Sequence, residues 1–207
     1  MTTFRINDSQ TQWTAEHQKS DIGSLRFSPD GKFLAITCFN GHAFVRNASR
    51  SRIVASFNVQ SDGSPLLAVR WHPKNQDQLI FSSAKGLISS WSISQNKELW
   101  SLSENDNTVN SLDISPSGAT FATVGSDSKV RVYDTETHKL SAHMATQNYM
   151  QGLVTGHTNR VFASLYLDES TVATGGWDNT VIVWDTRSGS VVRSIFGPGL
   201  CGNASVL

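Results

Sequence analysis

Histidines and acidic residues are the side chains that could carry acid–base or metal chemistry in this chain of 207 residues. His72 stands before Pro73, and no second ligand lies at a spacing typical of metal sites. The acidic residues show no arrangement that would bring two carboxylates face to face, and the P-loop, HExxH, CxxC and GxSxG motifs are absent. We therefore interpret His72 as a turn residue and predict no catalytic residue, no metal site and no cofactor.

Composition and charge narrow the class of protein. Hydrophobic residues make up 38% of the chain, and 17 basic residues balance 17 acidic ones. A neutral chain has no general attraction to nucleic acid or to an anionic membrane. No apolar run approaches the roughly 20 residues that cross a bilayer, the first ten residues do not resemble a signal peptide, and two cysteines provide no disulfide framework. We expect an intracellular protein, in the cytoplasm or nucleus, that binds neither nucleic acid nor membranes.

The clearest structural pattern lies in residues 156–196. Four short runs rich in Val, Ile, Thr and aromatic residues follow one another there, separated by Asp, Asn, Gly or Ser, near 160–167, 171–175, 180–185 and 190–196. Short runs of this kind between turn residues predict an antiparallel four-stranded sheet. The turn between the second and third runs is Trp177-Asp178-Asn179.

Similar units precede this one along the chain. Pro29, Pro73 and Pro116 each follow a strand-like run, and they are 44 and 43 residues apart. A repeat of this length predicts stacked supersecondary units that bury their faces against one another. We place the four units at about 22–59, 65–102, 107–144 and 156–197.

The last unit resembles a WD repeat, the blade of a β-propeller. The resemblance rests on Gly156-His157, Asp178 and Trp184-Asp185, which occur in order and at blade spacing. It implies an all-β propeller of four-stranded antiparallel blades, with about four complete blades in one domain over 1–207 and partial-blade strands at 4–17 and 200–207. WD-repeat propellers usually close with more blades, so we expect an open or incomplete ring. It would be a fragment of a longer chain, or would be completed by a missing half or a second copy.

The resemblance also implies a structural hydrogen-bond network. In the last unit its members would be His157, Thr174, Asp178 and Trp184, and in the third unit Thr123, Asp127 and Tyr133. Asn105 falls near the position of His157, so the third network lacks an imidazole. Each such bond contributes about 0.5–1.5 kcal/mol, and losing a partner of a buried group costs about 1–3 kcal/mol. We interpret these residues as architecture rather than as a catalytic site.

Loops on one face of the propeller are the expected binding site. Phe39, Ala84, Ser126 and Trp177 occupy the same turn position in the four units, and large exposed aromatics dominate interface energetics. We predict a partner-binding face of Phe39 and Trp177, with Lys85 and Arg160 as charges beside them. Residues 145–156, the longest insertion, add Tyr149 and Met150 to this prediction, either as functional residues or as an idle loop folded back on its blade.

The resemblance favours a non-catalytic scaffold for protein–protein interaction, or a subunit of a larger assembly. One alternative is a propeller that binds a small ligand or acts as an enzyme in its central channel, but the inner strands offer mainly Ser, Asn, Ala and Leu, with Asp113 as the lone acid. Another is a truncated fragment without independent function.

Overall fold

Four antiparallel sheets of four strands each make up this computed structural model, which describes residues 20–50, 52–144, 146–148 and 153–197. The strands of the first sheet are β1 (Ile22–Phe27), β2 (Phe33–Cys38), β3 (His42–Asn47) and β4 (Ile53–Asn58). Those of the second are β5 (Leu66–His72), β6 (Asn75–Ser83), β7 (Leu87–Ser92) and β8 (Lys97–Ser103). Those of the third are β9 (Val109–Ile114), β10 (Thr120–Gly125), β11 (Val130–Asp134) and β12 (Leu140–His143). Those of the fourth are β15 (Val161–Tyr166), β16 (Thr171–Gly176), β17 (Thr180–Asp185) and β18 (Ser190–Phe196).

Local sequence explains why the chain reverses where it does. In each sheet the strands pair in chain order, so every connection is a hairpin. Gly31 follows Pro29-Asp30, and Gly41 follows Asn40; both have positive φ, of 71° and 82°, which glycine adopts without steric cost. The all-β class and the four-stranded antiparallel units predicted from the sequence are confirmed.

The insertion before the fourth sheet is partly regular, contrary to the expectation of a loop. β13 (Thr146–Asn148) and β14 (Leu153–Thr155) pair as a small antiparallel hairpin. Their pairing satisfies backbone groups that a free loop would leave to water. Tyr149 and Met150, and the proposed partial strands at 4–17 and 200–207, lie outside the described residues.

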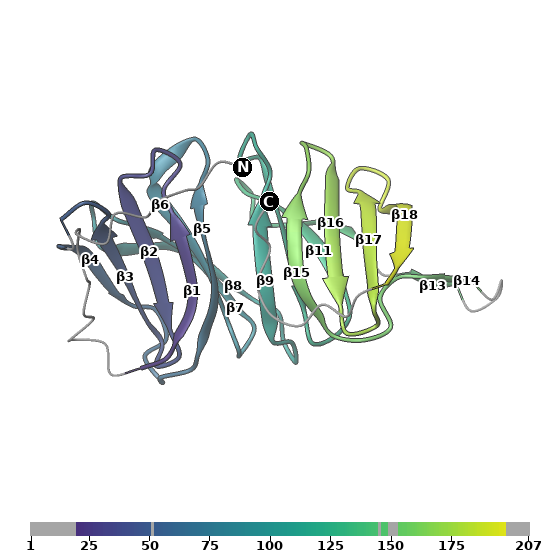
Figure 1. Cartoon of the computed structure of the whole chain (residues 1–207), viewed down its shortest axis with the longest axis horizontal. Coiled ribbons are helices and arrows are strands. Elements are labelled where there is room, and N and C mark those ends of the chain that lie inside the picture. The colour runs from purple at the N-terminus through teal and green to yellow at the C-terminus, as the bar shows by residue number, and fades with distance from the viewer. Residues whose placement is uncertain (1–19, 51, 145, 149–152, 198–207) are drawn as a thin grey trace, which may run out of the picture.

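The sheets stack face to face in chain order. Their first strands β1, β5, β9 and β15 lie side by side, and Figure 1 shows the sheets in a row from β1–β4 on the left to β15–β18 on the right. We call the face that packs on the preceding sheet the upstream face and the face that packs on the following sheet the downstream face. In the third sheet the upstream face carries Leu112, Ile114, Phe121 and Tyr133. Its downstream face carries Ala122, Val124, Val130 and Val132.

Three hydrophobic cores hold the row together, one at each junction between neighbouring sheets. Trp71 stacks on Phe33 and Phe81 packs on Phe57 at the first junction. Trp184 shares the core of the last junction with Val130 and Val132. Burying a large apolar side chain contributes about 1.5–3 kcal/mol, so each junction supplies much of the stability of the two sheets it joins.

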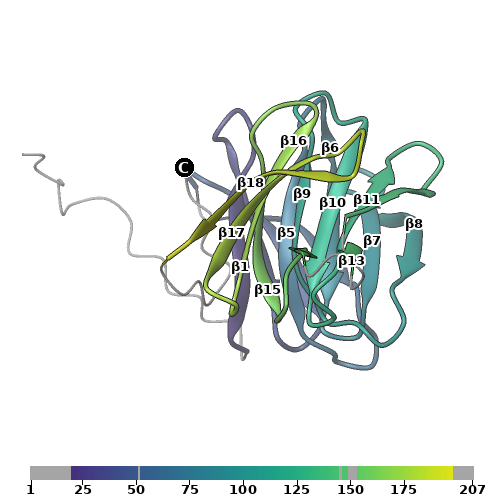
Figure 2. The ribbon, with the colours of Figure 1, turned by 90° about the vertical axis from the view of Figure 1, so that its right-hand side faces the viewer.

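The row is open in the described residues. The first and last sheets lie at its opposite ends, as Figure 1 shows, and Figure 2 views the molecule from the end of β17 and β18. Within the part of the chain that the structure describes, no sheet therefore packs on the upstream face of the first sheet or on the downstream face of the fourth. The described residues contain no helix that could span a bilayer.

Candidate functional site: two buried networks and a loop-rich rim

A chain of hydrogen bonds crosses the fourth sheet. His157 is buried in the loop before β15, with its Nδ1 2.8 Å from Asp178 Oδ2 and its Nε2 2.8 Å from Thr174 Oγ1. Trp184 Nε1 donates to the same Thr174 oxygen at 2.7 Å. The structure thus brings together the four residues predicted for this network.

The donors and acceptors assign one tautomer to His157. Asp178 can only accept when ionised, so His157 Nδ1–H donates to it. Thr174 accepts from Trp184 and can then donate its own proton to His157 Nε2. Every side-chain polar atom of these four residues has a hydrogen-bond partner. A fully satisfied network of this kind stabilises one arrangement of a core.

The charge of this network depends on pH. Burial lowers the pKa of His157 below its ordinary 6.5, although Asp178 opposes this with its charge and hydrogen bond. Burial raises the pKa of Asp178, but hydrogen bonds from Thr180 and Thr158 and the nearby His157 lower it overall. At neutral pH the folded protein therefore holds a neutral His157 against an ionised Asp178.

Acidification is expected to destabilise the protein through His157. Below pH 6.5 the unfolded chain binds a proton at this histidine and the folded chain does not, so stability falls as pH drops from 6.5 toward the lowered folded pKa. Thermal unfolding at about pH 7.5 and about pH 5.5 measures the effect, and His157→Gln should reduce this difference in Tm. Burial also lowers the pKa of His72, so part of the dependence should remain. The exposed His143→Gln serves as control, and an equal reduction in both variants would contradict this assignment.

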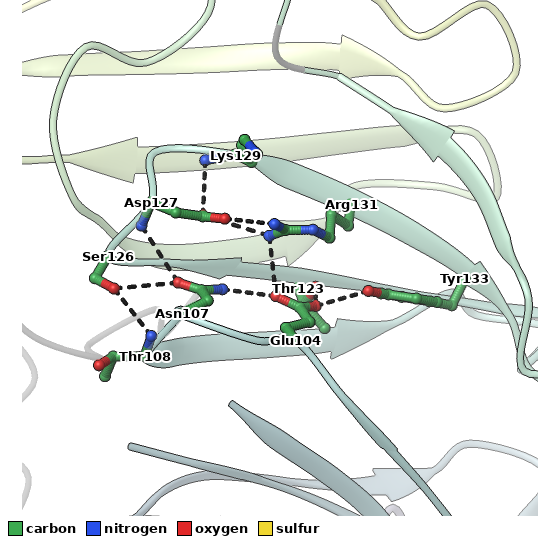
Figure 3. Close-up of polar contacts among 9 residues, drawn as sticks. All are labelled: Glu104, Asn107, Thr108, Thr123, Ser126, Asp127, Lys129, Arg131 and Tyr133. Carbon is green, nitrogen blue, oxygen red and sulfur yellow. Dashed lines mark hydrogen bonds and ion pairs between the residues drawn. The ribbon is translucent and has the colours of Figure 1, made fainter. Parts of the chain in front are cut away.

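The third sheet builds its network around a carboxylate that the sequence analysis missed. Glu104 is buried at the position before Asn105, and Figure 3 shows its side chain among donors from three directions. Its Oε1 accepts from Thr123 Oγ1 at 2.5 Å and from Tyr133 OH at 2.9 Å. Its Oε2 accepts from Asn107 Nδ2 at 2.6 Å.

Arg131 supplies the positive charge of this network. Its Nη1 donates to Glu104 Oε2 at 2.9 Å, and its guanidinium also pairs with Asp127, the turn residue predicted from the sequence (Figure 3). Burial works against the charged form of Arg131, but Asp127 and Glu104 outweigh it and raise its pKa. Burial and the charge of Glu104 raise the pKa of Tyr133 as well, so its hydroxyl remains a donor. A Glu–Arg–Asp cluster thus replaces the His–Asp pair of the fourth sheet.

Neither network resembles an open catalytic site. A nucleophilic hydroxyl must be accessible to substrate. Thr174 is buried, and its Oγ1 already accepts a hydrogen bond from Trp184 Nε1. Asp113, the lone acid of the inner strands, accepts from Arg70 Nε at 2.7 Å and from the Tyr166 amide at 2.7 Å. His72 caps a turn, since its Nδ1 accepts from the Lys74 and Asn75 amides at 3.2 and 3.1 Å. The described residues contain no group of three or more His, Cys, Asp or Glu that could hold a metal ion.

The rim of the fourth sheet carries an exposed aromatic cluster. Trp177 is 49% exposed, and its ring lies 4.8 Å from the Phe162 ring, measured between centroids. The Arg160 guanidinium stands 5.9 Å from the centre of the Trp177 ring, within cation–π range. The Trp177 amide donates to Arg160 O at 2.9 Å, which fixes the turn to the loop before β15. We call Arg160, Phe162 and Trp177 the rim cluster.

The other predicted rim residues do not join this cluster. Phe39 is exposed at the same turn position, but it belongs to the first sheet, and two sheets separate it from Trp177. Lys85 lies on the second sheet and forms an exposed ion pair with Asp62, its Nζ 2.6 Å from Oδ2. The described parts of the predicted partner face are therefore separate positions along one rim.

Comparisons with known proteins agree with this architecture. The family model for the anaphase-promoting complex subunit 4 WD40 domain matches residues 1–74, and the model for the WD domain, G-beta repeat, matches residues 96–134 and 149–185. Actin-interacting protein 1 of Drosophila melanogaster is 29% identical over 189 residues, which cover 90% of this chain and 29% of that protein. The ribosome biogenesis protein WDR12 homolog of Drosophila persimilis is 25% identical over 75% of this chain and 39% of its own length. WD repeat-containing protein 55 of Danio rerio is 30% identical over 59% of this chain and 30% of its own length. The chain thus spans well under half the length of these relatives.

Proposed function

We propose that this chain, which belongs to the WD-repeat family, is a non-catalytic scaffold that binds other proteins through the loop-rich rim of its sheets. The names of two relatives support an assembly role, since one is called actin-interacting and another a ribosome biogenesis protein. The saturated networks described above support a structural use of the histidine and the acids. A location in the cytoplasm or nucleus remains a prediction.

The observation that carries the proposal is the half-exposed Trp177 in the rim cluster. Its turn is held by a backbone hydrogen bond and its ring by Phe162, so little conformational entropy is lost when a partner covers it. Tryptophan and arginine are the residues most enriched in interface hot spots. Arg160 adds a positive charge beside the ring, which suits a partner segment with an apolar side chain and an acidic one.

Trp177→Ala is expected to remove partner proteins while leaving the fold intact. Losing a hot-spot tryptophan costs at least about 2 kcal/mol of binding, a drop in affinity of more than tenfold. The tagged full chain and its variant would be used to recover proteins from a lysate of cells that express it, with recovered proteins quantified by mass spectrometry. Near-ultraviolet circular dichroism and Tm should match those of the unchanged chain.

Two variants serve as controls for the rim cluster. Leu99→Ala removes an apolar side chain of similar exposure, 46%, from β8 on the second sheet. Phe39→Ala removes the aromatic at the matching turn of the first sheet. Both should retain the proteins that Trp177→Ala loses. If Trp177→Ala retains them too, the rim cluster is not the binding site.

A further inference from the structure

A hollow of about 400 Å³ lies between the first and second sheets, which are neighbours toward the left of Figure 1. It lies at the edge opposite the rim, since Phe33 begins β2 whereas the rim residue Phe39 follows the end of that strand. The first sheet lines it with Phe33, Val45 and Val54, and the second adds Ile93, Asp77 and Ser94. Sites that bind apolar groups have volumes of roughly 300–1,000 Å³.

The apolar lining is particular to this junction. Gln78 of the second sheet holds the position of Phe33, and the hollow beside Gln78 is lined mainly by polar and charged residues. In the third sheet the same position holds Thr120, whose Oγ1 is 2.9 Å from Tyr166 OH of the fourth. The first junction therefore places apolar side chains where the other two place polar ones.

The walls of the hollow are held by the core beside it. Phe33 and Ile93 pack at the margin of the first core, and the Phe33 ring stacks on Trp71 with 6.4 Å between centroids. Val54 is 48% exposed on β4, the outer strand, so the hollow can be reached from outside the row of sheets. An apolar group that displaces loosely held water from such a surface gains affinity. The lining thus favours an apolar occupant.

Asp77 gives the hollow its charge, as the one ionisable residue among the described residues that line it. Its Oδ1 accepts from the Ser94 amide at 2.7 Å, and its Oδ2 accepts from the Ser92 and Ser94 hydroxyls at 2.6 and 3.0 Å. Burial raises the pKa of Asp77, but these hydrogen bonds lower it overall, so the carboxylate is ionised at neutral pH. A carboxylate has about four acceptor sites, which leaves one for a donor from outside.

We propose that this hollow binds an apolar side chain of a partner protein, together with a neighbouring lysine or arginine of the same segment that pairs with Asp77. The rim cluster offers the opposite charge, that of Arg160, at the opposite edge of the sheets. The two sites therefore select segments of opposite charge. The inference goes beyond the proposed rim function and does not depend on it.

Peptides selected from a random library displayed on phage test the chemistry of the occupant. The bait is the full chain of 207 residues with Trp177→Ala, so that the rim cluster contributes no binders. We expect the selected peptides to carry an apolar residue close to a lysine or arginine. A selection that yields no such peptides, or peptides rich in Asp and Glu, would overturn the proposal.

The position of binding is tested with labelled synthetic copies of these peptides and fluorescence anisotropy. Val54→Lys brings a cation to the hollow and should weaken binding to the chain at least about tenfold. Leu99→Lys is the matched control, because Leu99 holds the same bulge position in the second sheet and is 46% exposed. It should bind like the unchanged chain. Equal affinities in Val54→Lys and the unchanged chain, or an equal loss in Leu99→Lys, would contradict the assignment.

Asp77→Asn tests the ion pair, because the amide oxygen still accepts hydrogen bonds but the charge is lost. We expect an affinity about threefold lower and a weaker dependence on salt than in the unchanged chain. Replacing the basic residue of the peptide with glutamine should lower its affinity for the unchanged chain to a similar extent, and should have little further effect on Asp77→Asn. If the two losses simply add, Asp77 does not pair with the peptide and the proposal is wrong.

Discussion

Replacing Arg131 with methionine is expected to lower the free energy of unfolding by about 3–5 kcal/mol, because the change removes one partner of a buried ion pair. Glu104 is almost fully buried, with a side-chain exposure of 2%, and Arg131 is its cationic partner. Methionine fills a similar space but leaves two carboxylates, Glu104 and Asp127, near each other without the cation between them. Each kcal/mol lowers the Tm of a domain of this size by about 2–4 °C, which circular dichroism can measure.

Lys85→Met is the matched control for this prediction. It makes the same substitution in an ion pair of similar length, but Lys85 and Asp62 are exposed and water screens them. Its Tm should therefore stay close to that of the unchanged chain. Adding Glu104→Gln to Arg131→Met should recover part of the loss, since the neutral amide still accepts from Thr123 and Tyr133. Equal losses in Arg131→Met and Lys85→Met would show that burial of the Glu104 pair is not what stabilises the third sheet.

The sequence predicts the network of the fourth sheet but not that of the third, for a local reason. His157 is the histidine of the Gly156-His157 opening, which stands at blade spacing from the turn that holds Asp178, so the motif alone identifies its partners. In the third sheet the position of His157 holds Asn105, and the acid lies one residue earlier, where Gly156 stands in the fourth sheet. The sequence does contain a sign of this second network. Glu104 and Arg131 are oppositely charged, and each stands at a position that is uncharged in the last unit. Only the folded geometry shows that the longer glutamate reaches the same pocket.

The rim illustrates a second limit of sequence patterns. Alignment of the units places Phe39 and Trp177 at equivalent turns, which defines their position within a sheet but not the distance between the sheets. Because the sheets follow one another in a row, equivalent positions on the first and fourth lie far apart. The neighbour that does reach Trp177 is Phe162, at a bulge between Val161 and Ala163 that shifts the register of β15. Alternation of residues does not predict such a bulge.

The junction between the second and third sheets is expected to be as sensitive as the Glu104 network. Asp113→Leu removes the carboxylate that accepts from Arg70 Nε, and both side chains of this pair are largely buried. The Tyr166 amide loses its acceptor at the same time. Burial, and to a smaller extent the charge of Arg70, lower the pKa of Arg26, and the negative charge of Asp113 opposes this shift. Removing Asp113 therefore also takes away a charge that favours the protonated form of Arg26. We expect a loss of about 3–5 kcal/mol, measured as a lower midpoint in urea.

Steric fit and lost charge can be separated at this position, because Leu165 already occupies the equivalent place in the fourth sheet. A leucine at position 113 therefore has a precedent for its volume, and a large loss in Asp113→Leu would report the missing carboxylate. Asp113→Asn keeps an acceptor for the Tyr166 amide while removing the charge, so it should be intermediate. Combining Arg70→Leu with Asp113→Leu should restore much of the stability, since replacing a whole buried ion pair with apolar residues is often neutral. If the double variant is no more stable than Asp113→Leu, the arginine and the aspartate contribute independently, and the prediction of a coupled ion pair is wrong.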